Sequence, residues 1–351
     1  MNTCIVTVYN SENCGSFLQA FALAKVLEKQ GHHVSFLYRS TIGTSHDFTN
    51  YLVSCIKLLL RGRFKRLKNR VITYHRFRRA VQKLSVIKMN SIEYKNQDFM
   101  VIGSDTLWNF DDVYFLKHKD LYSGYLFLKK KAISYASSMS NTKAETILND
   151  KLICDGIAHL KAISARDDYT ANTIKKIIGE KPCIVLDPTL LLSSEEYEII
   201  EGKCKYNNYI LIYSFREFTK EKINEIIKMK EMLNTIVISF GFYREWVDIN
   251  TPFDPFDLLA YYKNARYIIT DTYHGTLYSI IYKKTFVCFG QNKNKIRDIL
   301  TTLKLTNRFV FDEEQIVDKL LVEINYENTY RYLEKARQES LRYLKANIGE
   351  G

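Results

Sequence analysis

The chain has 351 residues, of which 46% are hydrophobic and 26% are charged, and this length and composition indicate two globular domains and exclude disorder. No apolar run approaches the roughly 20 residues that a membrane-spanning helix needs, the N-terminus lacks the basic start of a signal peptide, and the seven cysteines contain no CxxC pair. The net charge is +12, and we expect a cytoplasmic protein with free thiols and no metal site.

The first forty residues predict a βαβ unit. Residues 3–9 are apolar and β-branched, residues 16–30 have helical periodicity, and residues 33–38 read as the next strand. The loop with Asn13 and Gly15 leads into the helix, whose free N-terminal amides can hold an anion. The fingerprint GxGxxG is absent, so no NAD site is expected.

The positive charge is concentrated in the next segment. Residues 48–92 contain twelve Lys and Arg and no acid, so that the rest of the chain is neutral. Apolar residues recur there every three or four positions, which predicts a basic amphipathic helical insert at about residues 50–90. This insert is either a solvated helix docked on the core or an attachment to an anionic membrane surface or a lipid-linked substrate there. Nucleic-acid binding is the remaining alternative, but no recognised motif accompanies the charge, and we expect no nucleic-acid partner.

Strands that end in small or polar residues follow, at residues 98–102, 132–136, 162–165 and 183–186. Ser104 and Asp105 come just after the first of these and either bind substrate or form an Asx-type turn. Arg166 follows the third, where its guanidinium either faces a cleft or pairs with Asp167 or Asp168 on the surface.

A second series of strands is predicted at residues 209–215, 235–239, 267–270 and 286–289, with helices at 220–232 and 254–262. His274 lies in the strand-to-helix loop of residues 271–276, where an imidazole either transfers protons near neutral pH or caps its own loop. The amides of Gly275 and Thr276 favour an anion there. Arg297, after the last strand, can bind a carboxylate or a phosphate.

These elements predict an α/β protein with two Rossmann-like domains facing a cleft. Residues 1–202 form the N-terminal domain with its basic insert, residues 203–325 the C-terminal domain, and residues 326–351 a C-terminal helix. Ligands of open parallel sheets bind at the carboxyl ends of the strands, so the cleft is the expected site.

Together these motifs resemble the polysaccharide pyruvyl transferase family. The matching segments are NCGSFLQAFAL (13–23), VIGSDTLWN (101–109), AISYASS (132–138), ISARDDY (163–169), VLDPTLLL (185–192), YILIYSF (209–215), DLLAYYKNARYIITDTYHGTLYSIIYKKTFV (257–287) and IRDILTTLKLTNR (296–308).

The resemblance implies a GT-B-like fold and transfer of pyruvate from phosphoenolpyruvate to two hydroxyls of a sugar, forming a ketal and releasing phosphate. It places His274 in a proton transfer, Arg166 and Arg297 on the donor, and the leaving phosphate at the amides of Gly275 and Thr276. Asn13, Gly15, Ser104 and Asp105 are the further substrate-binding candidates. The scheme needs no metal and no cofactor beyond the donor. The implied acceptor belongs to capsule, exopolysaccharide or cell-wall glycan assembly, and the basic insert would suit a peripheral enzyme at the inner face of the membrane.

Two positions depart from the family pattern. Some branches carry Arg-Leu-His-Gly where this chain has Thr272-Tyr273-His274-Gly275, and the usual Gln of GSDQxWN is Thr106 here. The first change removes a donor-binding Arg. Two alternatives therefore stand beside pyruvyl transfer: a GT-B glycosyltransferase that uses a nucleotide sugar, and a non-catalytic glycan-binding protein.

Overall fold

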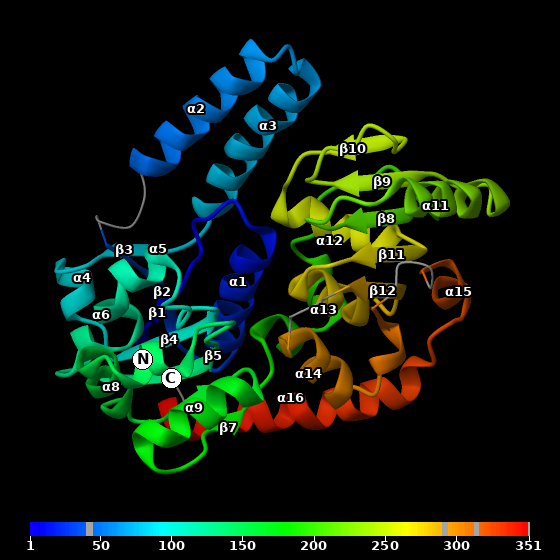
Figure 1. Cartoon of the computed structure of the whole chain (residues 1–351). Helices are drawn as coiled ribbons and strands as arrows, with labels where there is room; N and C mark the ends of the chain where they lie inside the picture. Colours follow the sequence, from blue (N-terminus) through cyan, green and yellow to red (C-terminus); the bar gives the residue numbers. More distant parts are fainter. Residues whose placement is uncertain (40–44, 290–293, 312–315, 350–351) are drawn as a thin grey trace.

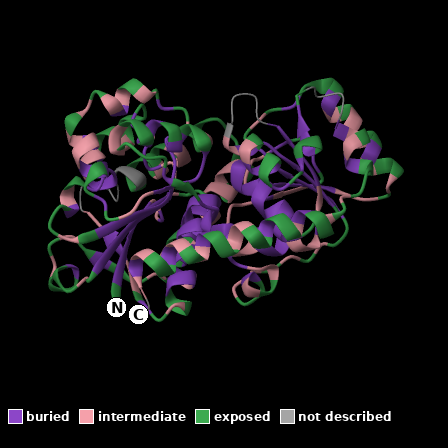
Figure 2. Cartoon of the chain, turned by 90° about the horizontal axis from the view of Figure 1, so that it is seen from below, coloured by how far each residue is buried: buried purple, intermediate pink, exposed green. Residues whose placement is uncertain are grey.

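The computed structural model describes residues 1–39, 45–289, 294–311 and 316–349. Over these residues the chain forms two all-parallel sheets, of seven and six strands, each flanked by helices. Figure 1 shows the two units side by side, with a pair of helices standing away from the first. In Figure 2 the strands of both sheets are largely buried, and the exposed residues lie on the surrounding helices and loops.

The first sheet has the order β3-β2-β1-β4-β5-β6-β7. Its strands are β1 (Asn2–Val6), β2 (His33–Tyr38), β3 (Val86–Lys88), β4 (Phe99–Asp105), β5 (Lys131–Ser137), β6 (Ser164–Ala165) and β7 (Cys183–Ile184). The helical elements of this unit, apart from the protruding pair, are α1 (Cys14–Lys29), α4 (Ile92–Lys95), α5 (Val113–Lys117), α6 (Lys119–Tyr122), η1 (Tyr125–Phe127), α7 (Ala144–Leu148), α8 (Lys151–Ala158), α9 (Asp168–Ile178), η2 (Pro188–Leu191) and α10 (Ser194–Glu198). The strand order reverses between β1 and β4, which opens a crevice at their carboxyl ends.

The second sheet has the order β10-β9-β8-β11-β12-β13. Its strands are β8 (Ile210–Tyr213), β9 (Val237–Phe240), β10 (Ile249–Thr251), β11 (Tyr267–Thr270), β12 (Thr285–Phe289) and β13 (Phe309–Val310). Its helical elements are α11 (Lys220–Met232), α12 (Pro255–Asn264), α13 (Tyr273–Ile281), α14 (Asn294–Thr302), η3 (Thr306–Arg308) and α15 (Ile316–Leu321). The predicted boundary at residues 202 and 203 falls in the segment between the two sheets.

The two units share a packed interface. One cluster of buried hydrophobic residues runs from α1 of the first unit into α12 and α13 of the second. The rings of Phe17 and Phe256 meet edge to face across it, with centroids 5.7 Å apart. Because apolar side chains close this contact, it holds the carboxyl ends of the two sheets at a common cleft.

The last helix, α16 (Tyr326–Ile348), spans both units. At its start, the hydroxyls of Tyr326 and Tyr330 donate hydrogen bonds to backbone carbonyls between residues 279 and 284 of the second unit. Near its end, Ser340 Oγ accepts from the Leu186 amide, and the Tyr343 hydroxyl donates to the Ser134 carbonyl in the first unit. The predicted C-terminal helix of residues 326–351 thus ends at Ile348, and residues 350 and 351 lie outside the described part.

The basic insert is a helical hairpin and not a single helix. It consists of α2 (Ser45–Leu60), residues 61–63 at its tip, and α3 (Phe64–Val81). Gly62 turns the chain with a φ of +63°, a conformation that costs glycine little. The two helices pack through the stacked rings of Tyr51 and Tyr74, 4.0 Å apart. The apolar repeat predicts the helical structure, but the repeat continues without interruption from α2 through Gly62 into α3, so it does not predict the turn.

The helices within the described residues include none that is long and apolar enough to cross a bilayer.

Candidate active site

A cleft with a volume of about 530 Å³ lies between the two units at the carboxyl ends of β1, β4, β8 and β11. It is lined by Val8, Asn10, Ser11, Asn13, Ser16, Asp105, Thr106, Asp112, Tyr114, Phe115, Tyr213, Phe215, Thr272, Tyr273, His274 and Lys295. Both units therefore contribute polar side chains to one cavity, as the predicted domain arrangement requires.

His274 lies in the wall of this cleft. The predicted loop is shorter than expected, because α13 already begins at Tyr273, so that His274 belongs to its first turn. Thr272 caps that turn: its hydroxyl accepts a hydrogen bond from the Gly275 amide at 2.9 Å. Nε2 of His274 is 3.5 Å from Oδ2 of Asp187. His274 therefore contacts a carboxylate of the opposite unit and does not cap its own loop.

The imidazole also packs on the first turn of α1. A Cβ atom added to Gly15 would lie 2.2 Å from Nδ1 of His274, which is far inside van der Waals contact. The absence of a side chain at Gly15 thus makes room for the ring, and the Gly15 amide donates to Asn13 Oδ1. Asn13 lines the cleft, but its side-chain oxygen is occupied as the cap of α1, where it accepts from the amides of Gly15 and Ser16.

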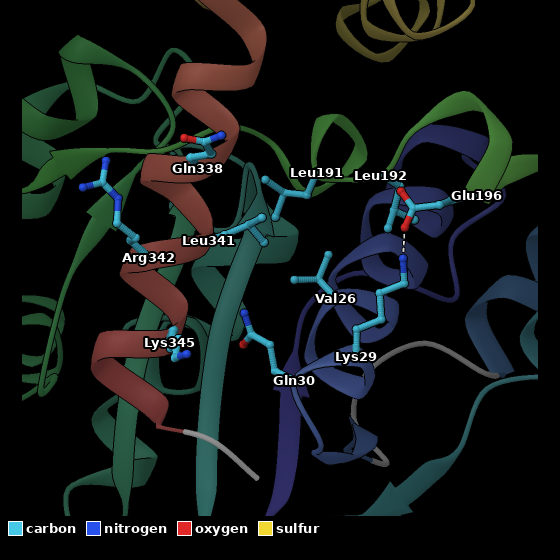
Figure 3. Close-up of a pocket in the computed structure, with 10 residues that line it drawn as sticks. All are labelled: Val26, Lys29, Gln30, Leu191, Leu192, Glu196, Gln338, Leu341, Arg342 and Lys345. Carbon is cyan, nitrogen blue, oxygen red and sulfur yellow. Dashed lines mark ion pairs between the residues drawn. The ribbon is translucent and has the colours of Figure 1, made fainter.

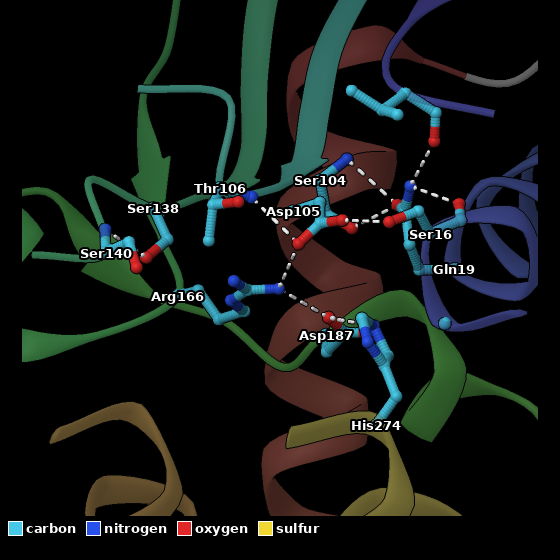
Figure 4. Close-up of polar contacts among 12 residues, drawn as sticks. Ser16, Gln19, Ser104, Asp105, Thr106, Ser138, Ser140, Arg166, Asp187 and His274 are labelled. Atoms are coloured by element: carbon cyan, nitrogen blue, oxygen red, sulfur yellow. Dashed lines mark hydrogen bonds and ion pairs between the residues drawn. The ribbon is translucent and has the colours of Figure 1, made fainter. Parts of the chain in front are cut away.

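Beneath the cleft, Arg166 joins two aspartates (Figure 4). Its Nη1 is 2.9 Å from Asp187 Oδ2 and 3.6 Å from Asp105 Oδ1. The Arg166 side chain is only 1% exposed, and the Tyr273 ring covers the guanidinium, whose carbon lies 4.7 Å from the ring centroid. The structure therefore brings Arg166 to the cleft but places it behind the wall, where it holds carboxylates.

Both aspartates are held ionised. Burial acts to raise the pKa of Asp187, but His274 and Arg166 outweigh it and leave that pKa well below its usual value. Burial opposes ionisation of Asp105 as well, yet Arg166, His274 and Lys295 lower its pKa, with a further contribution from the Ser16 hydroxyl. That hydroxyl donates to Asp105 Oδ2 at 2.8 Å. The cleft thus has a fixed set of charges before any ligand enters.

Asp187 was not predicted as a site residue. It directly follows the predicted strand of residues 183–186 and precedes a proline, which is a signal of the kind that identified Asp105. Its Oδ1 accepts hydrogen bonds from the amide and the hydroxyl of Thr189 at the start of η2, while Oδ2 faces Arg166 and His274. One carboxylate therefore orients two site residues.

Lys295 was also missed, although it lies two residues from the predicted Arg297. Its ammonium is 5.5 Å from the centroid of Tyr273, and it lines the cleft. Arg297, the predicted donor-binding residue, does not line the cleft: it is exposed and stacks on Phe309 and Phe311. Two residues along a helix rotate the side chain by about 200°, so the cleft receives Lys295 and the surface receives Arg297.

Three further predicted residues are bonded internally. The Gly275 amide donates to Thr272 Oγ1, and the Thr276 amide donates to the Thr272 carbonyl, so neither amide is open to a phosphate. A side chain at Gly275 would collide with Thr270 Oγ1 at 2.2 Å. Ser104 points into the first unit, where its hydroxyl donates to Gln19 Oε1 at 2.5 Å. These three residues shape the site without lining it.

Among the cavities outside the cleft in the described part of the chain, two are similar to it in volume. One, of about 510 Å³, is on the other side of α1 between η2 and α16 (Figure 3), and it contains none of the predicted site residues. The other, of about 640 Å³, lies at the base of the hairpin and shares Asn10 and Ser11 with the cleft. No group of three or more His, Cys, Asp or Glu side chains among the described residues is placed to hold a metal ion.

Comparisons with known proteins agree with this architecture. A family model described as polysaccharide pyruvyl transferase matches residues 13–293. Similar solved structures include a putative UDP-N-acetylglucosamine 2-epimerase from Listeria monocytogenes, with a TM-score of 0.57 and 10% identity over 100% of this chain and 97% of that one. The UDP-GlcNAc 2-epimerase from Methanocaldococcus jannaschii has a TM-score of 0.56 and 12% identity, over 99% and 100% of the chains.

An alpha-glucosyltransferase in complex with UDP has a TM-score of 0.50 and 11% identity, over 99% of this chain and 96% of that one. No curated protein matches the chain by sequence. At these identities the solved structures show the fold alone, and they confirm the predicted GT-B-like arrangement of two Rossmann-like units.

Proposed function

Because the chain belongs to the polysaccharide pyruvyl transferase family, we propose that this transferase moves the pyruvyl unit of phosphoenolpyruvate onto two hydroxyls of a sugar in a glycan. The CH2 carbon of the donor gains a proton and becomes a methyl group. One sugar oxygen bonds to C2, and the second replaces phosphate there. Of the two hydroxyl protons lost, one balances the new methyl proton and the other leaves with phosphate.

The observation that carries this proposal is the contact between His274 and the ionised Asp187 in the cleft wall. His274 lines the cleft with Asp187 3.5 Å from its Nε2, and an imidazole at that position can take part in proton transfer to the donor. Arg166 is a positioning residue in this scheme. It keeps Asp187 ionised and in place, and it does not touch the donor.

The donor carries a carboxylate and a phosphate, and both need cations. Lys295 lies on the same side of the cleft as His274, over Tyr273, and we assign it to the donor anion in place of the Arg that Thr272 replaces. Asp105 lies across the cleft with Ser16. As an acceptor of hydrogen bonds it suits sugar hydroxyls and disfavours the anionic donor, which separates the two substrates within one cavity.

Ligand-dependent thermal unfolding and calorimetry test the donor. Phosphoenolpyruvate at one hundred times its dissociation constant should add about 2.7 kcal/mol to the free energy of unfolding. Lys295→Gln should remove most of that gain, whereas Arg297→Gln, the matched control on the exposed face of the same helix, should retain it. No stabilisation of the wild-type protein by phosphoenolpyruvate would contradict the proposal.

A nucleotide-sugar reaction is the second candidate, and the GT-B-like fold is the observation that favours it. UDP-N-acetylglucosamine belongs in the same unfolding experiment. Stabilisation by that ligand, together with indifference to phosphoenolpyruvate, would assign the cleft to a nucleotide sugar.

A further inference from the structure

One side of α2 carries large apolar residues that are exposed to solvent. Phe48, Leu52, Ile56 and Leu60 follow one another at four-residue intervals and therefore lie on one side of the helix, and all four are exposed. At the tip, 82% of Leu60 and 65% of Phe64 are accessible. These exposed apolar side chains therefore gather at the end of a hairpin that projects from the first unit.

The charges beside this surface have one sign. Lys57, Arg61, Arg63, Lys65 and Lys68 are exposed, and no ion-pair partner faces any of them within the described part of the chain. Two bases nearer the body are paired, Arg70 with Glu12 at 2.5 Å and Arg76 with Asp257 at 2.5 Å. At the tip, five exposed bases thus surround the exposed apolar residues, and among the described residues none of the five has an ion-pair partner.

We propose that the tip of the helical hairpin docks on an anionic lipid bilayer, inserting Leu60 and Phe64 among the acyl chains while the flanking bases bind lipid phosphates. An amphipathic helix with apolar residues on one face and Lys and Arg around it has the composition of an interfacial membrane anchor. Anionic headgroups supply the negative charge that the tip itself lacks.

Charge complementarity favours this occupant over a second copy of the chain. A two-fold contact through the same face would bring the bases at residues 57, 61, 63 and 65 of one copy close to those of the other, and like charges at short range repel. A bilayer with anionic lipid covers the same apolar surface and attracts those charges.

The base of the same hairpin, at the opposite end from its tip, lies beside the cleft. The cavity at the base of the hairpin is lined by Arg70, Tyr74 and Phe77 of α3 and joins the cleft at Asn10 and Ser11. A hairpin whose tip is held on a bilayer therefore tethers the unit that carries the cleft to the lipid surface. Membrane docking does not rest on the proposed reaction, because its measurement needs neither phosphoenolpyruvate nor an acceptor.

Vesicle flotation with the full chain tests the proposal, with phosphatidylcholine alone compared with phosphatidylcholine mixed with phosphatidylglycerol. We expect binding to the mixed vesicles, little to the neutral ones, and a steep loss of binding as salt is raised. Leu60→Ser with Phe64→Ser, and separately Arg61→Gln with Arg63→Gln and Lys65→Gln, should each weaken binding at least tenfold. All five positions are exposed, so unchanged thermal unfolding will verify that the variants fold.

The matched control removes three exposed bases elsewhere, with Lys129→Gln, Lys175→Gln and Lys176→Gln. It lowers the net charge by the same amount and should retain vesicle binding. The proposal is overturned if the control and the tip variants bind equally, or if the wild-type chain does not float. A dimer in sedimentation analysis that Leu60→Ser and Phe64→Ser dissociate would equally overturn it and assign the surface to a second copy.

Discussion

Arginine serves opposite purposes in two regions of this molecule. In the cleft wall, Arg166 is buried, joined to Asp187 and Asp105, and covered by Tyr273. At the tip of the hairpin, Arg61 and Arg63 are exposed, and no described residue pairs with them.

The difference shows that burial, and not residue type, decides whether an arginine stabilises the fold or attracts an external partner. A buried guanidinium holds its partners at fixed positions in low dielectric, where removing it is costly. An exposed guanidinium contributes little to the fold, and its field reaches a partner only across a screening distance of about 10 Å at ordinary salt. The buried Arg166 positions Asp187 and Asp105 in the site, whereas the exposed bases at the tip attract the anionic bilayer under the proposal above.

The largest expected effect is on stability at Arg166. Arg166→Ala leaves two carboxylates buried without their cation, and we expect it to lower the free energy of unfolding by about 3–5 kcal/mol in urea denaturation. Arg66→Ala is the control. Arg66 is partly exposed, lies 3.8 Å from the exposed Glu245 and 4.9 Å from the centroid of Tyr243, and its loss should cost about 1 kcal/mol. If Arg166→Ala and Arg66→Ala lowered the free energy of unfolding equally, the proposed difference between buried and exposed arginine would be contradicted.

A similar contrast holds for catalysis at His274. Under the proposed function, His274→Asn should lower the turnover number by about 10²–10⁴-fold, because the proton donor is lost while the fold remains. Phosphate release from phosphoenolpyruvate in the presence of acceptor is the readout. His33→Asn, at an exposed position on β2, should leave the rate unchanged, and a His274→Asn variant with full activity would remove this residue from the mechanism.

Gly15 tests whether the close packing on the imidazole matters. Gly15→Ala places a methyl group 2.2 Å from His274 Nδ1, so the ring must shift and its contact with Asp187 must change. We expect a loss of about 1–3 kcal/mol of stability together with reduced activity. Gly62→Ala, where nothing lies within 4 Å, should cost about 1–2 kcal/mol from its positive φ alone and leave activity intact. Comparison of the two separates displacement of the histidine from the general cost of replacing glycine.

The smallest effect concerns acid pH. The pKa of Asp187 in the folded state lies below its unfolded value, so its ionised form contributes stability above the unfolded pKa, and that stability is lost as the pH falls toward the folded pKa. Asp187→Asn should therefore flatten the dependence of the free energy of unfolding on pH below about 4. Asp155→Asn is the control, because the Asp155 side chain is 44% accessible and pairs only with the exposed Lys151. If Asp187→Asn kept the wild-type dependence of stability on pH, the charge cluster would be contradicted.

The interior strands could be predicted from the sequence because each of them is an apolar run that is long enough to be recognised. It missed β3, β10 and β13, which have only two or three residues at or near the sheet edges, too few for any pattern. His274 was placed correctly at a strand-to-helix junction. The covering of Arg166 by Tyr273 could not be predicted, because the two residues come from different units and meet only when the units pack.

Helical phase explains the errors at residues 295 and 297. A basic stretch marks a charged segment, but the rotation of the helix decides which cation faces the cleft, and that rotation is set by the burial of Ile296 and Ile299. Likewise, the sequence predicts that the amides of Gly275 and Thr276 can bind a phosphate, because it does not show that both amides donate hydrogen bonds to Thr272.

The C-terminal helix α16 has a consequence for how the chain is made. Its last turns supply Ser340 and Tyr343 to the unit that contains the first strand, and a residue beyond them, Gly349, receives a contact from His32. Part of the buried surface of the first unit is thus supplied by a helix that is synthesised after the whole of the second unit. The first unit stays partly uncovered until α16 has been made, so a truncation that removes the last turns of α16 harms the unit farthest from it in the sequence.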